Sequence, residues 1–102
     1  MVSRNIVLGV FEWDPVKDIS NQATHGVPFR LATQAFSDPK ALILSDSAHS
    51  TSAEIREFLV GRVGDRVLTV RFTRRHHRIR LIGAGYWRKF QKTYHAYHTQ
   101  NP

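Results

Sequence analysis

Residues 66–82 read RVLTVRFTRRHHRIRLI, and this stretch decides the fold. Apolar and polar residues alternate over residues 66–73 and again over residues 78–82, which is typical of two strands that each bury one face. Residues 74–77, Arg-Arg-His-His, separate the two runs and form the expected turn. We therefore predict a β-hairpin whose buried face carries Leu68, Val70 and Phe72.

The hairpin brings arginines together. A turn centred between Arg75 and His76 keeps the apolar residues of both strands on one face, which supports this register. Like charges directly opposite each other destabilise a strand pair by about 0.2–1 kcal/mol, and a bound anion would reverse the effect. We therefore predict a phosphate site here; the alternative is that the long side chains extend apart into water. The expected pairs are Val70 with Leu81, Phe72 with Ile79, Arg71 with Arg80, and Thr73 with Arg78.

Two helices are expected before the hairpin. Asp14 can accept from free backbone N–H groups at a helix start, and Pro15 suits the first helical position. Gly26 can take the left-handed conformation that ends this helix. Val16, Ile19 and Ala23 would share one helix face. A second helix begins at Pro28, with Phe29, Ala32, Ala35 and Phe36 at helical spacing, and ends at Ser37-Asp38-Pro39.

Strands and loops account for most of the remainder. The expected strands outside the hairpin are residues 7–13, 41–44 and 58–63, with a polar surface loop over residues 46–53 and a turn at Gly64-Asp65. Gly83-Ala84-Gly85 is expected to loosen the backbone after the hairpin. The resulting order is β-α-α-β-β-β-β-α, which predicts one α+β domain over residues 1–102 with a small antiparallel sheet packed by helices.

The last expected helix spans residues 86–98. Its aromatic residues lie at i, i+3, i+7 and i+10, which favours one buried row. We expect Trp87 and Phe90 to pack in the core, and Tyr94 and Tyr97 to present hydroxyls at the wet edge of a site. The basic side chains on the other side of this helix are Arg88, Lys89 and Lys92.

The charge is strongly asymmetric. The chain has 15 basic and 8 acidic residues, a net charge of +7, and no acid follows Asp65. Arginine outnumbers lysine 11 to 4, which suits bidentate binding of phosphate. A polyanion partner is therefore favoured, with nucleic acid ahead of an acidic protein, over a merely solvated basic surface.

Several classes are excluded. The sequence has no cysteine, so it has no disulfide framework, thiolate metal site or cysteine nucleophile. No apolar run is long enough to span a membrane, and Met1–Val10 lacks the features of a secretory signal. We therefore expect no membrane partner, and the absence of cysteine fits a reducing compartment.

Histidines are the candidates for proton transfer. His76 and His77 lie in the expected turn among arginines, where they serve as acid or base or are ordinary polar turn residues. His25 has the alternative role of binding the last carbonyls of its helix. His95 and His98 are neighbours on the last helix, but no third ligand follows at a spacing typical of a metal site.

The sequence resembles the BrnT toxin family, the toxin half of type II toxin–antitoxin pairs. The resemblance covers about residues 11–94 and depends on the order and spacing of many short pieces. They are Phe11-Glu12-Trp13-Asp14-Pro15, Lys17, Asn21, His25-Gly26-Val27, Phe29, Ala32, Phe36, Asp38-Pro39, Glu54, Arg56, Gly61, Arg66-Val67-Leu68, Thr73, Arg75 and Arg78-Ile79-Arg80.

This chain departs from the family pattern at three places. It has Thr73-Arg74-Arg75 where the family often has Thr-Glu-Arg, Gly83-Ala84-Gly85 where the family often has Ser-Ala-Arg, and Gln91 where a glutamate is common. The run Gly-Ala-Gly-Tyr-Trp-Arg-Lys over residues 83–89 indicates a variant subgroup.

The resemblance implies a RelE-like ribonuclease fold and a small cytoplasmic endoribonuclease that cleaves RNA without metal or cofactor. It also implies a BrnA-type antitoxin with a ribbon-helix-helix half that neutralises the toxin and carries the complex to operator DNA. Two alternatives stay open: a toxin-fold protein with weak or no catalysis that acts as antitoxin partner and corepressor, and a basic nucleic-acid-binding module unrelated to toxins.

Metal-free RNA cleavage needs a base for the ribose 2′-OH, an acid for the leaving 5′-oxygen, and cations for the phosphorane charge. We assign the phosphate charge to Arg80 and Arg71, and proton transfer to His77 or His25, with Tyr94 as a further acid. The residues expected to bind backbone phosphates without sequence preference are Lys17, Arg75, Arg78, Arg88, Lys89 and Lys92.

Overall fold

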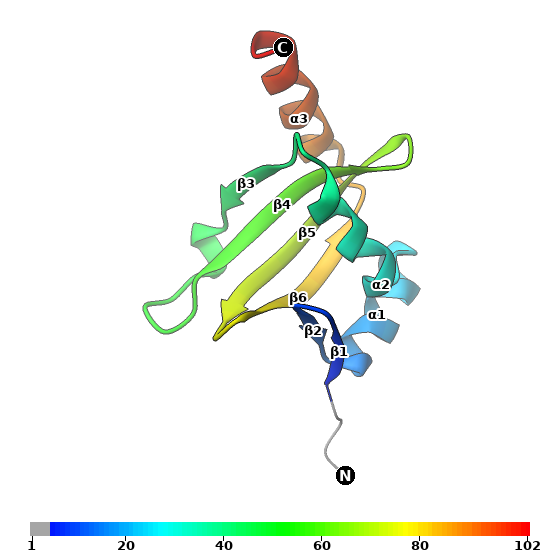
Figure 1. Ribbon diagram of the computed structural model, residues 1–102, viewed down its shortest axis with the longest axis vertical. Coiled ribbons are helices and arrows are strands. Elements are labelled where there is room, and N and C mark those ends of the chain that lie inside the picture. Colours follow the sequence, from blue (N-terminus) through cyan, green and yellow to red (C-terminus); the bar gives the residue numbers. More distant parts are fainter. Residues whose placement is uncertain (1–4) are drawn as a thin grey trace.

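One sheet of six strands organises the chain, in the order β1-β2-β6-β5-β4-β3 (Figure 1). The structure is a computed structural model that describes residues 5–102; residues 1–4, the start of the segment examined for a secretory signal, lie outside the described residues. The strands are β1 Ile6–Leu8, β2 Phe11–Trp13, β3 Leu42–Ser45, β4 Arg56–Val63, β5 Arg66–Arg75 and β6 Arg78–Gly85. The helices are α1 Pro15–His25, α2 Phe29–Ala32 and α3 Arg88–Gln100, with 3-10 turns η1 Thr33–Ser37 and η2 Ser47–His49.

The predicted α+β class is confirmed, with two changes near the N-terminus. The single strand expected over residues 7–13 is a hairpin, β1 and β2, which turns at Gly9 with φ of 60°. The second change is that β2 lies parallel to β6, in an otherwise antiparallel sheet. Residues 7–13 form a short apolar run that predicts one strand, and a two-residue turn at Gly9-Val10 is too short to interrupt that apolar pattern visibly.

Helix α1 begins and ends where its capping residues predict. Asp14 Oδ1 accepts a hydrogen bond from the Val16 N–H at 2.9 Å, and Gly26 takes φ of 70° while its N–H bonds the Gln22 carbonyl. The apolar residues Val16 and Ile19 point to solvent rather than to the core. The buried residue of α1 is Asn21.

Asn21 completes the edge of β6. Strand β2 pairs with β6 only as far as Arg80, so the backbone of β6 beyond that point has no neighbouring strand on this side. The Asn21 side chain accepts from the Ala84 N–H at 3.1 Å and donates to the Ala84 carbonyl at 2.9 Å. It also donates to the Val27 carbonyl at 2.9 Å. The Asn21 side-chain amide thus makes the hydrogen bonds that a neighbouring strand would make at Ala84, and it fixes α1 against the sheet.

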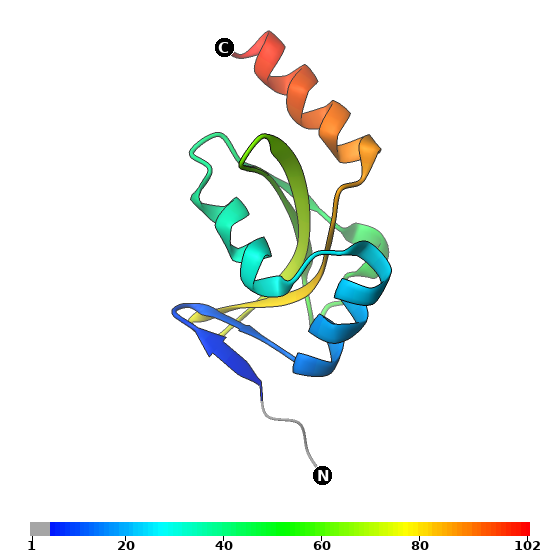
Figure 2. The ribbon, with the colours of Figure 1, turned by 90° about the vertical axis from the view of Figure 1, so that its right-hand side faces the viewer.

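The main core lies on one face of the sheet, under α2 and η1. The second predicted helix is one α-helical turn followed by a 3-10 turn, and it ends at Asp38 as expected. Phe29, Ala32 and Ala35 are fully buried against Val70 and Phe72 of β5. Figure 2 shows α2 and η1 on one side of the sheet and α1 and η2 on the other.

The register of the β5–β6 hairpin differs from the predicted one. The turn is His76-His77 alone, with His76 at φ of 55°, so Arg74 and Arg75 belong to β5. Thr73, not Arg71, pairs with Arg80, and a bulge between Arg71 and Phe72 shifts the rest of the ladder. A shift of two residues leaves the same side chains on each face, so the apolar pattern could not distinguish the two registers. The glycines of residues 83–85 remain inside β6 instead of loosening it.

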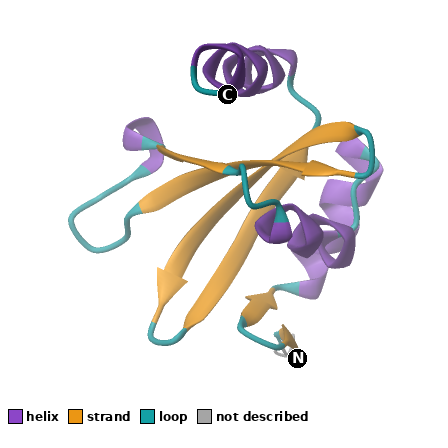
Figure 3. Cartoon of the chain, turned by 45° about the horizontal axis from the view of Figure 1, so that its top comes forward, coloured by secondary structure: helices purple, strands orange, loops and turns teal. Residues whose placement is uncertain are grey.

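The burial of the aromatic residues in and before α3 also differs from the prediction. Trp87 precedes the helix as its N-cap residue, and Trp87 and Phe90 are half-buried, whereas Tyr94 is the buried member. Tyr94 packs with Val60 and Val67 in a second, smaller core cluster. Figure 3 shows that a short loop joins α3 to the end of the sheet.

The contact between η1 and β4 gives a test of the packing. A Cβ added at Gly61 would lie 2.4 Å from the Ala35 carbonyl oxygen, whereas one at Gly83 would meet only Asn21 Oδ1 at 3.8 Å. We expect Gly61→Ala to lower the free energy of unfolding by about 1–3 kcal/mol, because backbone has to move. Gly83→Ala should change it by less than about 0.5 kcal/mol. Urea denaturation followed by circular dichroism measures both, and equal stability of the two variants would contradict the packing.

Candidate nucleic-acid interface

The sheet has a cationic face opposite the main core. We define the cationic face as the side to which Arg71 and Arg75 of β5 and Arg78 and Arg80 of β6 point. Strand alternation places these side chains opposite Val70 and Phe72, which point into the core. The arginines therefore gather on one face as predicted, but the strand pairs that bring them together are Thr73–Arg80 and Arg75–Arg78.

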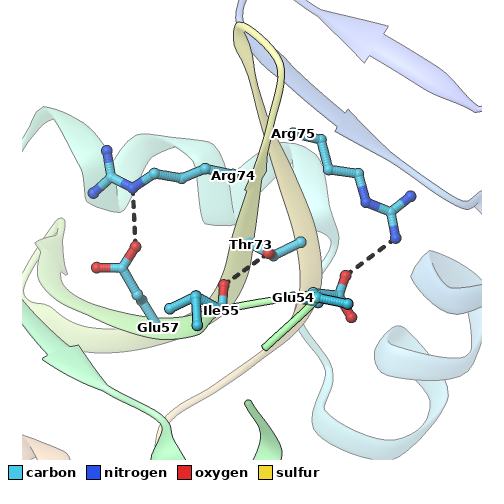
Figure 4. A pocket seen from close by; sticks show the side chains of 7 residues that line it. Glu54, Ile55, Glu57, Thr73, Arg74 and Arg75 are labelled. Atoms are coloured by element: carbon cyan, nitrogen blue, oxygen red, sulfur yellow. Dashed lines mark hydrogen bonds and ion pairs between the residues drawn. The ribbon is translucent and has the colours of Figure 1, made fainter. Parts of the chain in front are cut away.

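Two of the hairpin arginines pair with carboxylates near the start of β4. Arg74 and Arg75 leave β5 on opposite sides, toward Glu57 and Glu54 respectively (Figure 4). Arg74 is thus absent from the cationic face. Arg78 donates to the Gly9 carbonyl at 3.0 Å. Arg74 and Arg75 thus each have a carboxylate partner, whereas Arg78 has a neutral carbonyl and keeps its full positive charge.

Arg80 is held at the edge of the cationic face by strand β2. Its Nη1 lies 3.0 Å from Glu12 Oε2, and its Nη2 lies 3.3 Å from Asn5 Oδ1. Both charged side chains are largely buried, with 17% and 14% exposed. The parallel pairing of Glu12 with Arg80 brings these groups together. A phosphate at Arg80 would therefore share the guanidinium with Glu12.

Arg71 is held from the opposite side by the loop after β3. Arg71 Nε lies 3.1 Å from Asp46 Oδ2, and Asp46 Oδ1 lies 2.9 Å from His49 Nδ1. Neither Arg71 Nε nor Asp46 Oδ2 completes a well-aligned hydrogen bond, although both atoms are buried. Asp46, His49 and Arg71 thus form a linked group, which we call the Asp46 cluster.

Beside Arg71 lies a hollow of about 260 Å³ that combines rings and cations. The Arg71 guanidinium lies 5.4 Å from the centre of the Phe58 ring, and Lys89 Nζ lies 5.5 Å from the centre of the Phe90 ring. We call this hollow the aromatic pocket; its lining residues are Phe58, Arg71, Trp87, Lys89 and Phe90. Stacking rings beside cations are the side chains with which proteins bind single-stranded nucleic acid.

Gly85 positions one wall of the aromatic pocket. A Cβ at Gly85 would lie 3.0 Å from the Trp87 ring, so the absence of a side chain lets that ring lie close to β6. The Trp87 ring also packs against His25, with the two ring centres 5.1 Å apart at an interplanar angle of 68°. His25 and Lys17 of α1 also line a smaller hollow with Ile82 of β6. Helix α1 therefore places His25 against the Trp87 wall of the aromatic pocket, while Lys17 lies at the smaller hollow.

The tip of the hairpin forms a separate region. His76, His77, Arg75 and Arg78 are exposed there and line a hollow with Gly9, Val10 and Glu12. On the other side of this tip, Arg75 donates to Glu54 and lowers the pKa of that carboxyl, against a smaller opposing effect of desolvation. Arg56 lowers this pKa further.

The Tyr94 side chain has a structural role. Its hydroxyl donates to Asp38 Oδ2 at 2.6 Å, and the same carboxylate accepts from the N–H groups of Arg62 and Lys40. Burial alone would raise the pKa of Asp38, but these hydrogen bonds outweigh burial and hold it below its ordinary value of 3.8. Burial, together with the Asp38 carboxylate, raises the pKa of Tyr94. This pair joins α3 to the end of η1, and the hydroxyl is not free.

The other candidate residues of α3 lie on its outer side. Arg88, Lys89 and Lys92 are exposed, with Lys89 at the aromatic pocket. His98 Nε2 lies 2.7 Å from the Lys40 carbonyl oxygen.

Within residues 5–102, no group of three or more His, Asp or Glu side chains is arranged to hold a metal ion. Over the same residues, no helix has the length and hydropathy to cross a membrane.

Sequence reasoning missed Asp46, His49, Phe58 and Glu12 as site residues. Asp46 and His49 fall in a polar stretch that favours a surface loop, yet Asp46 is 4% exposed. A buried carboxylate indicates a charged partner, but the burial of Asp46 cannot be predicted from a stretch of polar residues that is typical of an exposed loop. The partner, Arg71, is 25 residues further along the chain.

A small α+β domain with rings and cations gathered on one sheet face belongs to the class of proteins equipped to bind nucleic acid. The family model for the ribonuclease toxin BrnT of type II toxin–antitoxin systems matches residues 13–90, and the chain belongs to this family. The match confirms the predicted resemblance. A comparison with curated proteins finds no match.

The Tyr94–Asp38 hydrogen bond predicts a pH-dependent effect on stability. We expect Tyr94→Phe to lower the free energy of unfolding at pH 7 by about 1.5 kcal/mol, because a hydrogen bond to a charged acceptor is lost. The lowered pKa of Asp38 means that its contribution is complete above the unfolded value and is lost as pH falls through the folded value. The difference from the unaltered protein should therefore shrink in acid.

Urea denaturation at pH 7 and at pH values below 4 measures this difference. Tyr97→Phe is the matched control, since the Tyr97 side chain is 49% exposed. It should leave the free energy of unfolding within about 0.5 kcal/mol of the original value. A Tyr94→Phe effect that stays constant down to pH 2 would contradict the role of Asp38.

Proposed function

We propose that this BrnT-family protein is a metal-independent endoribonuclease that acts in the cytoplasm. The ribose 2′-oxygen attacks the adjacent phosphorus, the P–O5′ bond breaks, and the products carry a 2′,3′-cyclic phosphate and a 5′-OH. This reaction needs positioned cations and proton-transfer groups rather than a cofactor. Family membership supports ribonuclease activity; the choice of mechanism is our proposal.

The observation that carries this proposal is the aromatic pocket beside Arg71. Phe58, Trp87 and Phe90 offer ring faces, and Arg71 and Lys89 offer cations in the same hollow. A base that stacks on the rings would bring its own phosphate to the guanidinium. The pocket is open to solvent and lies on a sheet face, so an extended strand of RNA has access to it.

Four residues are proposed for the chemistry. Arg71 and Arg80 stabilise charge on the phosphorane, and each guanidinium is anchored by a single carboxylate, Asp46 or Glu12. His25 is placed beside Trp87 and is proposed to protonate the 5′-oxygen. His77, at the exposed hairpin tip, is the other histidine candidate for proton transfer. Tyr94 is left out, because Asp38 holds its hydroxyl.

Backbone phosphates are proposed to follow a line of cations across the cationic face. Residues from α1, the hairpin tip and the start of α3 surround the proposed chemistry. These contacts orient the strand and confer no base preference. The proposed residues are Lys17, Arg75, Arg78, Arg88, Lys89 and Lys92.

The proposed partner is a ribbon-helix-helix antitoxin of the BrnA type, which neutralises the toxin and brings it to operator DNA. Membership of a type II toxin–antitoxin family supports a protein antitoxin. Solvent-exposed Val7, Val10, Val16 and Ile19 in the N-terminal hairpin and α1 provide apolar surface for such a partner. Co-expression with the adjacent reading frame, followed by purification of a stable complex, tests the pairing.

A catalytically weak toxin-fold protein that acts as antitoxin partner and corepressor is the second candidate function. The observation in its favour is that Arg71, Arg75 and Arg80 are already paired with carboxylates. It predicts a stable antitoxin complex without loss of RNA. Purified protein incubated with RNA in EDTA separates the two functions, because only the first yields 2′,3′-cyclic phosphate ends.

The two faces of β5 supply a matched test of the proposed activity. Arg71 and Arg74 lie in the same strand and each pairs with one carboxylate, but on opposite faces. We expect Arg71→Gln to lower the cleavage rate by about 10²-fold, as the loss of a positioned charge-stabilising group does. Arg74→Gln should stay within about twofold, because an exposed ion pair contributes little. Single-turnover cleavage in EDTA measures both; equal losses would contradict the assignment of the cationic face.

The affinity for an uncleavable 2′-O-methyl RNA, measured at several salt concentrations, distinguishes the contribution of base stacking from that of phosphate contacts. We expect Trp87→Ala to weaken binding about tenfold with an unchanged slope of log K against log salt, because stacking on one base is lost. Lys89→Ala should reduce that slope by about 0.7, the value for one phosphate of a single strand. Fluorescence anisotropy at several salt concentrations measures both quantities, with Tyr97→Ala as the control. A slope that Lys89→Ala leaves unchanged would exclude a phosphate contact.

A further inference from the structure

We propose that His49 is the general base of this ribonuclease and that Asp46 is its positioning residue. The inference rests on the proposed function and adds to it a residue outside the sequence-predicted site. His49 Nδ1 lies 2.9 Å from Asp46 Oδ1, and the other oxygen of the same carboxylate lies 3.1 Å from Arg71 Nε. A proton-transfer group and the phosphate-binding arginine therefore share one carboxylate.

The burial of the two side chains fits these separate roles. Asp46 is 4% exposed, whereas His49 is 51% exposed. An ionised carboxylate only accepts hydrogen bonds, so the proton of a neutral His49 ring is on Nδ1. The lone pair is then on Nε2, for which residues 5–102 provide no hydrogen-bond partner. This is the tautomer that a general base needs, with its ring held in a fixed orientation.

The Asp46 carboxylate does not cap its own turn. Asp46 is the N-cap residue of η2, but its side chain makes no capping hydrogen bond there. The turn is held instead by Ser50, whose hydroxyl donates to the Asp46 carbonyl at 2.7 Å and accepts from the Arg56 N–H at 2.8 Å. The Asp46 carboxylate is left to His49 and Arg71.

The position of Arg71 connects this pair to RNA. Arg71 lines the aromatic pocket and also contacts Asp46, so a phosphate bound at Arg71 lies next to the Asp46 cluster. Its Nε faces Asp46 without a well-aligned hydrogen bond. Among the described residues, no hydrogen bond occupies the two terminal nitrogens of Arg71. They are available to the phosphate of the scissile bond.

The proposed step balances without a further reagent. His49 Nε2 takes the proton of the ribose 2′-OH as the 2′-oxygen forms a bond to phosphorus. The P–O5′ bond breaks, and the 5′-oxygen takes a proton from His25 or from solvent. His49 then returns its proton to solvent. Arg71 and Arg80 neutralise the charge that develops on the phosphoryl oxygens.

The first test is chemical rescue of His49→Ala. We expect the cleavage rate of this variant to fall by about 10²-fold, within the range that general base catalysis contributes. Added imidazole should restore at least a tenth of the lost rate, because it can occupy the vacated space and accept the proton. His95→Ala, in an exposed position on α3, is the matched control and should cleave as the unaltered protein does. A His49→Ala variant with an unchanged rate would overturn the inference.

The second test separates a base from an acid. An RNA with sulfur in place of the scissile 5′-oxygen needs no proton on its leaving group. If His49 is the base, His49→Ala should remain about 10²-fold slow on this substrate. Full recovery of the rate would show that His49 acts on the leaving group and would overturn the assignment as base.

The third test concerns Asp46. We expect Asp46→Asn to slow cleavage by itself and to add less in the His49→Ala background than it does alone, since residues that act as a unit are not additive. The effect that remains in that background is the loss of the contact between Asp46 and Arg71. Imidazole should not rescue Asp46→Asn, because the histidine still fills its place. Independent effects of the two substitutions would show that Asp46 does not act through His49. If the unaltered protein does not cleave RNA in EDTA, the proposed function fails; if it cleaves and His49→Ala cleaves equally, only this inference fails.

Discussion

The amide of Asn21 determines how the two halves of this protein meet. Strand β2 leaves the far end of β6 without a partner, and a bare strand edge exposes unpaired backbone groups. Asn21 satisfies the N–H and the carbonyl of Ala84, and its bond to Val27 also holds the turn after α1. Because α1 is fixed at this edge, His25 lies against Trp87, and the cationic face acquires one of its walls.

Charge pairing between distant segments shapes that face. The first 61 residues contain most of the acids, and the rest of the chain contains most of the arginines. In the folded protein, Glu12, Asp46 and Glu54 each meet an arginine of the hairpin. These ion pairs hold the guanidinium groups in defined places. Lys89 has no carboxylate partner among residues 5–102, and it lies beside the Phe90 ring of the aromatic pocket.

The BrnT family match and this geometry support each other. The match places the chain in a family of ribonuclease toxins, and the structure shows how its aromatic pocket is formed. Gly85 has no side chain, and the Trp87 ring lies beside it. Arg71, with Asp46 and His49, supplies a charged group close to the same pocket.

The sequence by itself determined the local structure: Asp14 and Gly26 set the ends of α1, and the alternation in β5 set which side chains face the core. These features depend on neighbouring residues, so they can be read from short windows. Only the tertiary structure decided the hairpin register, the burial of Tyr94 rather than Trp87, and the meeting of Asp46, His49 and Arg71. A shift of the β5–β6 register by two residues leaves the same side chains on each face, so the sequence pattern does not fix the register. Asp46 meets Arg71 because β3 and β5 lie on either side of β4, which is a property of the folded sheet.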